Sequence, residues 1–151
     1  MISLENSIRQ NKAAMTVLNS LSKGAVFQLA VDGEKADVSR ETSGMSFKNP
    51  TESEKTDFMI SMPENIFSEL FSENVSSLNV EDYLTFSAKL LAGKGRDRVH
   101  LAVYANFLKL TLHGYPKLIK LGGSSFWKVL KENGVGSIFA IEKKLATFRN
   151  K

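Results

Sequence analysis

The segment from residue 108 to residue 125 constrains the fold most, because it joins a strand pattern to a glycine break and a helix start. Residues 108–112 alternate leucine with polar side chains, which is the period of a strand with one buried face. Residues 118–121 resume an apolar pattern and predict a second strand. The Gly122-Gly123 pair then interrupts the chain, and Ser124-Ser125 are suitable N-cap residues for a helix. This segment therefore predicts two strands followed by a helix.

Apolar periodicity divides the remaining chain into further helices and strands. Helical spacing predicts helices over residues 3–22, 64–71, 79–92, 126–131 and 138–148. Period-2 alternation predicts strands over 25–31, 36–38 and 58–62, and residues 44–47 either extend the second strand or start another. The Asp32-Gly33 pair predicts a hairpin turn, because both residue types tolerate a positive φ. Residues 96–107 fit a strand and a helix equally well.

This order of elements predicts an α+β domain, in which one mostly antiparallel sheet is covered by helices. A length of 151 residues suits a single domain, and 42% hydrophobic residues are enough for a real core. We expect residues 1–151 to form this one domain, with a core at about 24–121 and helical extensions at both ends. We see no internal repeat and no low-complexity tract.

Composition excludes several classes of protein. No apolar run approaches twenty residues, which argues against a membrane span. The N-terminus has no basic region followed by an apolar stretch, so we expect no secretory signal. The absence of cysteine rules out disulfides and thiolate-bound metals. We therefore expect a soluble, cytoplasmic protein.

Charge is distributed unevenly along the chain. From Gly93 onward, twelve basic residues face three acids, which gives +9, whereas the first ninety-two residues carry −5. Such polarity predicts a basic face that meets phosphate, a lipid headgroup, nucleic acid or an acidic partner. Alternatively, the two halves mix in space and the field averages out.

Three segments resemble the sterol carrier protein type 2 family. They are Phe58-Met59-Ile60-Ser61-Met62-Pro63-Glu64 continuing through Leu70, the helix end Lys89-Leu90-Leu91-Ala92-Gly93-Lys94, and Leu108-Lys109-Leu110-Thr111-Leu112-His113-Gly114 with Lys117-Leu118-Ile119-Lys120-Leu121. The resemblance covers about residues 24–121, and it favours a helix at 96–107. The chain departs from the family pattern at Tyr115-Pro116, in the long connection at 96–106 and in the tail after Gly122.

The resemblance implies a five-stranded sheet covered by helices, with an apolar tunnel under the C-terminal helix. A tunnel of this kind would hold an acyl chain, a fatty acyl-CoA or a sterol. The family has no invariant catalytic residue to carry over to this chain, and we expect no cofactor.

Large apolar side chains are numerous for one small sheet, and such side chains line apolar binding pockets. The alternative is that each of them simply fills the core. The residues that we expect to line an apolar cavity are Phe58, Ile60, Phe67, Phe71, Tyr83, Phe86, Leu90, Phe107, Leu110, Leu112, Trp127, Leu130, Ile138 and Phe139. Of these, the last four are the candidates for its lid.

A second candidate site is the predicted helix start, where free backbone N–H groups can hold an anion. The residues expected to bind a phosphate or headgroup there are Gly122, Gly123, Ser124, Ser125, Lys117, Lys120 and Lys128. The alternative is a plain helix cap after a tight turn. Gly93-Lys94-Gly95 lacks the spacing of a phosphate-binding P-loop and is expected to end a helix.

His100 and His113 are the only histidines. A metal site would need both together with carboxylates, and the nearest acid, Asp97, is wrongly spaced to join His100 as a ligand. An acid–base role for either histidine is an alternative function. Nucleic-acid binding through the basic final third is a further alternative, although the aromatic residues occupy apolar-face positions unlike those of a stacking platform.

The function that we expect is non-catalytic binding or transport of a lipid, fatty acyl or sterol-like ligand in an apolar cavity with a basic rim. Transient contact with an anionic membrane surface would suit that role, whereas nucleic acid is the less favoured partner.

Overall fold

Five strands form one sheet in the computed structural model, which describes residues 2–95 and 97–133. The strands are β1 (Val26–Val31), β2 (Glu34–Glu41), β3 (Gly44–Lys48), β4 (Phe58–Met62) and β5 (His100–Val103). Their order across the sheet is β3-β2-β1-β4-β5. The β1–β4 pair is parallel and the other three pairs are antiparallel. The predicted α+β class with one mostly antiparallel five-stranded sheet is confirmed.

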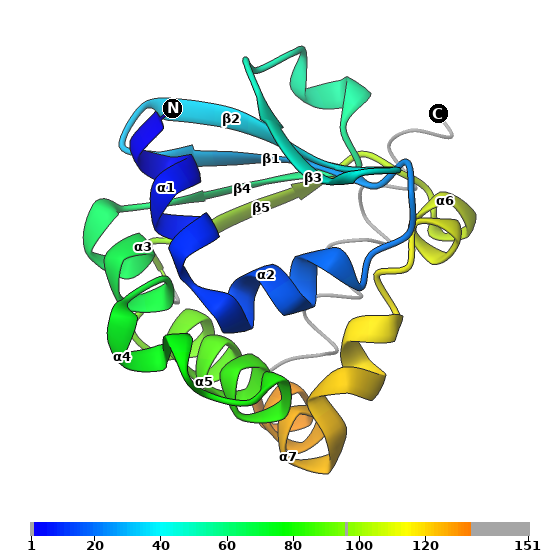
Figure 1. The fold of residues 1–151 in the computed structure, drawn as a ribbon. Coiled ribbons are helices and arrows are strands. Elements are labelled where there is room, and N and C mark those ends of the chain that lie inside the picture. Colours follow the sequence, from blue (N-terminus) through cyan, green and yellow to red (C-terminus); the bar gives the residue numbers. More distant parts are fainter. Residues whose placement is uncertain (1, 96, 134–151) are drawn as a thin grey trace.

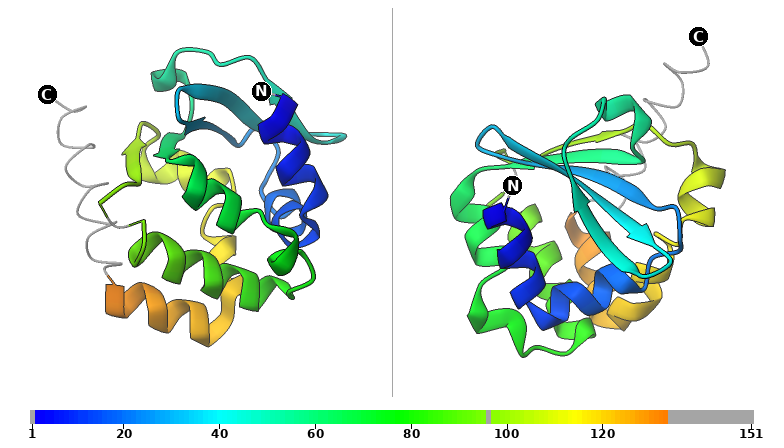
Figure 2. Two further views of the ribbon diagram at one scale, coloured as in Figure 1. Left: turned by 90° about the vertical axis from the view of Figure 1, so that its left-hand side faces the viewer. Right: turned by 45° about the horizontal axis from the view of Figure 1, so that its top comes forward.

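Helices cover one face of this sheet (Figure 1). They are α1 (Ile2–Gln10), α2 (Lys12–Asn19), α3 (Glu64–Leu70), α4 (Glu73–Ser76), α5 (Val80–Ala92) and α7 (Lys117–Asn133), while α6 (Phe107–Leu112) lies beside one end of the sheet. Figure 2 shows α5 and α7 side by side in a layer below the sheet. A short 3-10 turn, η1 (Ser53–Lys55), precedes β4.

The β1–β2 hairpin follows its predicted turn. Val31 pairs with Glu34, and the intervening Asp32 and Gly33 have φ values of 46° and 88°. Both residues therefore adopt the left-handed conformation that a two-residue hairpin turn requires. The prediction of a turn at Asp32-Gly33 is confirmed.

The predicted strands at 108–112 and 118–121 are wrong, because these residues form α6 and the first part of α7. Asn106 caps α6, since its Oδ1 accepts a hydrogen bond from the backbone N of Lys109 at 2.8 Å. Leu108 and Leu112 are also four residues apart and hence share one helix face. Their alternation is as compatible with a helix as with a strand, and leucine favours the helix.

Two further expectations need correction. Residues 100–103 form β5, not a helix, because they pair with β4 at the sheet edge, with Leu101 opposite Ile60. Residues 3–22 form two helices, because Asn11 ends the first and caps the second. Its buried Oδ1 accepts from the backbone N of Ala14 at 2.9 Å.

Other helix ends follow the sequence. Asn79 caps α5 by accepting from the backbone N of Asp82 at 2.8 Å, and Gly93 ends that helix. The predicted glycine break appears inside α7 as a kink at Gly123, which has a φ of 68° and a ψ of −163°. The helix predicted at 138–148 lies outside the described residues.

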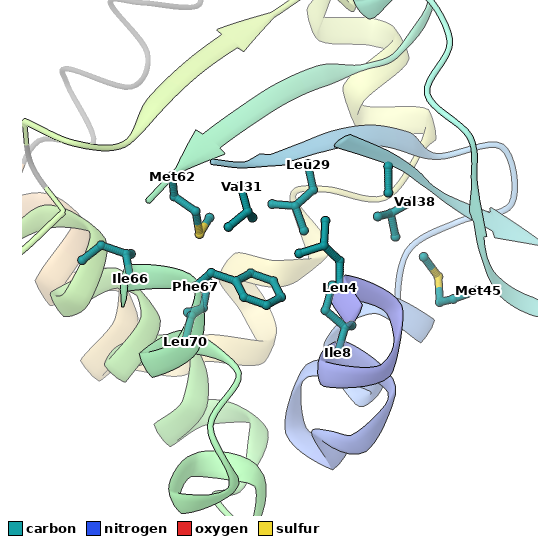
Figure 3. Close-up of a cluster of buried hydrophobic side chains, with 11 residues drawn as sticks. Leu4, Ile8, Leu29, Val31, Val38, Met45, Met62, Ile66, Phe67 and Leu70 are labelled. Carbon is teal, nitrogen blue, oxygen red and sulfur yellow. The ribbon is translucent and has the colours of Figure 1, made fainter. Parts of the chain in front are cut away.

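The main core lies between the sheet and helices α1 and α3 (Figure 3). Its buried members are Leu4, Ile8, Leu29, Val31, Ala36, Val38, Met45, Met62, Ile66, Phe67 and Leu70. A second buried cluster joins α2, α4 and α5 and consists of Ala13, Ala14, Val17, Val75, Tyr83 and Leu84. The apolar interior is thus divided into two clusters.

Candidate functional site

The helix-covered face of the sheet is buried in the main core but only partly buried over β4 and β5. Leu29 and Met62 are almost completely buried in the main core. Phe58 and Ile60 share a face with Met62, because alternate residues of β4 point the same way, yet both are only partly buried. Leu101, opposite Ile60, is also only partly buried. An incompletely covered apolar surface therefore extends over β4 and β5.

Helix α5 contributes apolar side chains next to this surface. Leu90 and Leu91 are partly buried and pack against the main core, whereas Phe86 packs against the second cluster. Phe71 packs against both clusters and so marks the boundary between them. We call the set Phe58, Ile60, Phe71, Leu90 and Leu91 the apolar lining. All five members are only partly buried.

The predicted cavity residues divide into three groups. Phe67 and Tyr83 are buried, whereas Phe58, Ile60, Phe71, Phe86 and Leu90 are partly buried. On α6, Leu110 is partly buried, but Phe107 and Leu112 are each 66% exposed and do not join the apolar lining. The predicted lid, Trp127, Leu130, Ile138 and Phe139, lies outside the described side chains.

An open groove of about 410 Å³ lies between helices α3 and α4 on one side and α5 on the other. Its apolar part comes from Val75, Phe86 and Leu90. Lys94 stands at its rim, and its Nζ lies 2.7 Å from a carboxylate oxygen of Glu69. Both side chains of this ion pair are well exposed, so the interaction between them is weak.

A buried polar cluster forms around Asp57, just before β4. Oδ2 of Asp57 accepts hydrogen bonds from the backbone N of Val26 at 3.0 Å and from the hydroxyl of Tyr115 at 2.8 Å. The same oxygen lies 2.7 Å from Nδ1 of His113. Asp57 is completely buried, and within the described residues its Oδ1 has no hydrogen-bond partner.

The carboxylate of Asp57 orients the imidazole of His113. A carboxylate at this distance favours the proton on Nδ1, which leaves Nε2 as the atom that can accept a proton. Nε2 faces Gly24, where an added Cβ would lie 3.4 Å away. Gly24 borders an open pocket of about 590 Å³, which Lys23 and Arg40 also line. Gly24 thus lies between the imidazole of His113 and this pocket.

Tyr115 completes the cluster on its apolar side. Its ring meets the ring of Phe58 edge to face at a centroid distance of 5.3 Å, and Phe58 stacks on Phe27 at 5.0 Å. Burial, together with the negative charge and hydrogen bond of Asp57, raises the pKa of Tyr115 well above its ordinary value. Tyr115 is therefore a neutral donor to Asp57 at physiological pH.

Sequence reasoning named His113 but missed Asp57 and Tyr115 as its partners. Asp57 precedes His113 by 56 positions, and the only local signal was a single acid directly before an apolar strand. His100 is exposed and pairs with Ser61 near the far end of β4, so the two histidines lie apart. Among the described residues, no group of three or more histidine, aspartate or glutamate side chains is placed to hold a metal ion.

The predicted anion site is occupied by the chain itself. An added Cβ at Gly123 would lie 2.8 Å from the carboxylate of Glu81, and one at Gly122 would collide with the ring of Phe126 at 2.3 Å. The carboxylate of Glu81 opposes a second anion at this position. Lys117 donates to the hydroxyl of Ser22 at 3.0 Å. Ser124, Ser125, Lys120 and Lys128 are exposed.

Within the described residues, no helix is both long enough and apolar enough to cross a membrane. The chain matches no protein-family model, no curated protein and no solved structure.

Proposed function

We propose that this protein binds and carries a ligand with a long apolar chain, of the fatty acyl or sterol-like class, without transforming it. The observation that carries the proposal is the apolar lining, a set of large apolar side chains from β4, α5 and Phe71 that are only partly buried. Side chains of a finished core would be expected to be buried, as Leu29 and Val38 are. An acyl chain seated on the lining would bury this remaining surface, and each methylene buried contributes about 0.8 kcal/mol.

The sterol carrier resemblance and the basic half of the chain support the same proposal. The resemblance implies a helix-covered five-stranded sheet, which is the architecture found. Lys94, paired with Glu69, borders the groove between α3, α4 and α5 beside Phe86 and Leu90, which places a cation next to apolar side chains. This combination of apolar wall and few polar groups is usual in ligand sites.

Native mass spectrometry of the protein as purified, followed by denaturing extraction, tests the proposal. We expect a co-purifying lipid, or a stoichiometric adduct after addition of a long-chain fatty acid, together with a raised melting temperature. A short-chain carboxylate such as hexanoate is the matched control, because it has the headgroup without the chain. An empty protein that gains no adduct and no stability from any long-chain ligand contradicts the proposal.

A second function is favoured by the His113–Asp57 pair, namely proton transfer to a molecule in the pocket bordered by Gly24. An imidazole that a buried carboxylate orients suits general acid–base catalysis. Among the described residues, no hydroxyl is hydrogen-bonded to Nε2, so the arrangement favours proton transfer over a serine nucleophile. Acyl esters and thioesters are suitable test substrates. Turnover that falls about a hundredfold in His113→Ala supports this function, and turnover unchanged by the substitution contradicts it.

A further inference from the structure

Helix α6 presents an apolar face to solvent. Phe107 is 66% exposed, Leu108 67% and Leu112 66%, and they are the most exposed large hydrophobic side chains in the described part of the chain. None of the six side chains of α6, all of which the structure describes, is fully buried. An apolar cluster of this kind on a protein surface marks an interaction site more often than a random exposure.

The three side chains lie together on the helix. At about 100° per residue, Phe107, Leu108 and Leu112 span an arc of about 140°, within which the remaining side chain is that of Thr111. Leu110 lies outside this arc and is the partly buried side chain that faces the protein. Because the Asn106 cap holds the start of α6, the helix keeps its form with this face unpacked.

The charge around α6 is uniformly positive along the sequence. From Arg98 to Lys131 the chain contains no aspartate or glutamate but six basic residues. Lys109 lies on α6, and the segment after it is anchored to Ser22, whose backbone N donates to His113 O at 2.9 Å. Lys117 also contacts Ser22, and the exposed Lys23 follows. Cations thus flank the apolar face of α6.

We propose that α6 docks on an anionic lipid bilayer, with Phe107, Leu108 and Leu112 inserted and the neighbouring lysines against the headgroups. Apolar side chains bordered by lysine are what an interfacial element needs, and each lysine near an anionic surface adds attraction. A protein partner would need both an apolar surface for α6 and acidic side chains for the lysines. An anionic bilayer offers an apolar interior and negative headgroups together.

This inference rests on the proposed carrier function, because the docked helix α6 would be the place where an acyl ligand passes between bilayer and protein. Tyr115 follows α6 by three residues and packs on Phe58, which belongs to the apolar lining. A chain leaving the bilayer at α6 therefore meets apolar side chains that lead to the lining.

Vesicle flotation with the full chain tests the docking. Vesicles of phosphatidylcholine alone are compared with vesicles of phosphatidylcholine and phosphatidylglycerol, each at low and high salt. We expect binding to the anionic vesicles, weakened by salt, and reduced by at least about tenfold in the double variant Leu108→Gln/Leu112→Gln. Lys109→Gln should reduce it by about fivefold. Leu121→Gln is the matched control, because Leu121 is an exposed leucine of the same basic segment outside α6.

Three results would overturn the docking. They are absence of wild-type binding to anionic vesicles at low salt, equal binding by the double variant, and a concentration-dependent dimer that the double variant abolishes. A large fall in the melting temperature of the double variant, with binding retained, would also overturn it by placing this face in contact within the protein.

Failure of the docking and failure of the carrier function can be told apart. Fatty-acid binding in solution is measured on the same wild-type and double-variant proteins. Solution binding without vesicle binding removes the docking and keeps the carrier function. Vesicle binding through α6 without any solution binding keeps the docking surface and removes its role in lipid exchange.

Discussion

Nδ1 of His113 lies 2.7 Å from Oδ2 of Asp57, although 56 positions of sequence separate the two residues. The contact ties the end of α6 to the start of β4, and Tyr115 donates to the same oxygen from the following turn. One buried carboxylate therefore fixes the position of the segment that connects the sheet to α7. Its removal should affect both stability and the geometry of His113.

We expect Asp57→Ala to lower the free energy of unfolding by about 3 kcal/mol, because it leaves buried donors from Val26 and Tyr115 without an acceptor. Urea unfolding at neutral pH measures this change. Asp97→Ala is the matched control, since Asp97 is exposed, and it should stay within about 0.5 kcal/mol of wild type. Equal stabilities of the two variants would contradict the account of the Asp57 cluster.

Stability should fall at alkaline pH. The folded state holds the pKa of Tyr115 above its ordinary value of about 10, chiefly through burial, and burial also raises the pKa of Tyr83. Above pH of about 10, the unfolded chain therefore releases phenol protons that the folded chain retains, so rising pH favours unfolding. Below that pH the contribution of these groups is fully present.

Tyr115→Phe isolates the contribution of the Tyr115 phenol to this loss of stability. It should cost about 1 kcal/mol at neutral pH through the lost hydrogen bond to Asp57. Above pH of about 10, the free energy of unfolding of the variant should fall less steeply than that of wild type, by about 1.4 kcal/mol per pH unit. Unfolding titrations at several alkaline pH values check both parts. A variant that loses stability with pH as steeply as wild type would show that Tyr115 ionises normally in the folded state.

Two glycines with similar backbone angles should respond differently to alanine. Gly33 and Gly114 have φ values of 88° and 87°, which penalise any side chain. An added Cβ at Gly33 meets nothing within 4 Å, whereas one at Gly114 would lie 2.9 Å from the backbone N of Ser22. We expect Gly33→Ala to cost about 1 kcal/mol and Gly114→Ala about 3 kcal/mol. Thermal unfolding separates them, and similar costs would mean that Gly114 has more room than the structure gives it.

Truncation of a buried and of an exposed aliphatic side chain should have different costs in stability. Ile66 is completely buried in the main core, whereas Leu108 is 67% exposed on α6. Ile66→Ala should cost about 3 kcal/mol through lost burial and the cavity left behind. Leu108→Ala should change stability by less than about 0.5 kcal/mol. Chemical denaturation of both variants checks the assignment, and a costly Leu108→Ala would place this side chain in a packed environment.

Local signals in the sequence predicted much of the fold. The Asp32-Gly33 turn needs positive φ, and Asn79 caps its own helix, so short-range chemistry decides both elements. The strands on either side of the hairpin show their core face by alternation of apolar residues, although Gln28, Ala30 and Asp37 on the other face are buried as well. By contrast, Leu108 and Leu112 of α6 are exposed, so their spacing carries no information about a buried face. The strand prediction there failed for that reason.

The candidate site depends on contacts that are distant in the sequence. β5 was ambiguous because its four residues are too few for a period, and its strand form depends on pairing with β4. Phe58 was recognisable as large and apolar, but its partial burial depends on packing against Phe27 and Tyr115, which are distant in the sequence. The Asp57–His113 contact likewise needs β4 and α6 to be brought together in space.

The central claim is that the apolar lining binds a long acyl chain. Its most direct test is an equilibrium titration of the protein with a long-chain fatty acid, followed by displacement of a fluorescent analogue. We predict saturable binding that is weakened at least about tenfold by Leu90→Trp, which fills the lining, and left unchanged by Leu121→Trp on the outer surface of α7. Circular dichroism is the check that both variants are folded. Absence of saturable binding by wild type, or equal binding by both folded variants, would contradict the claim.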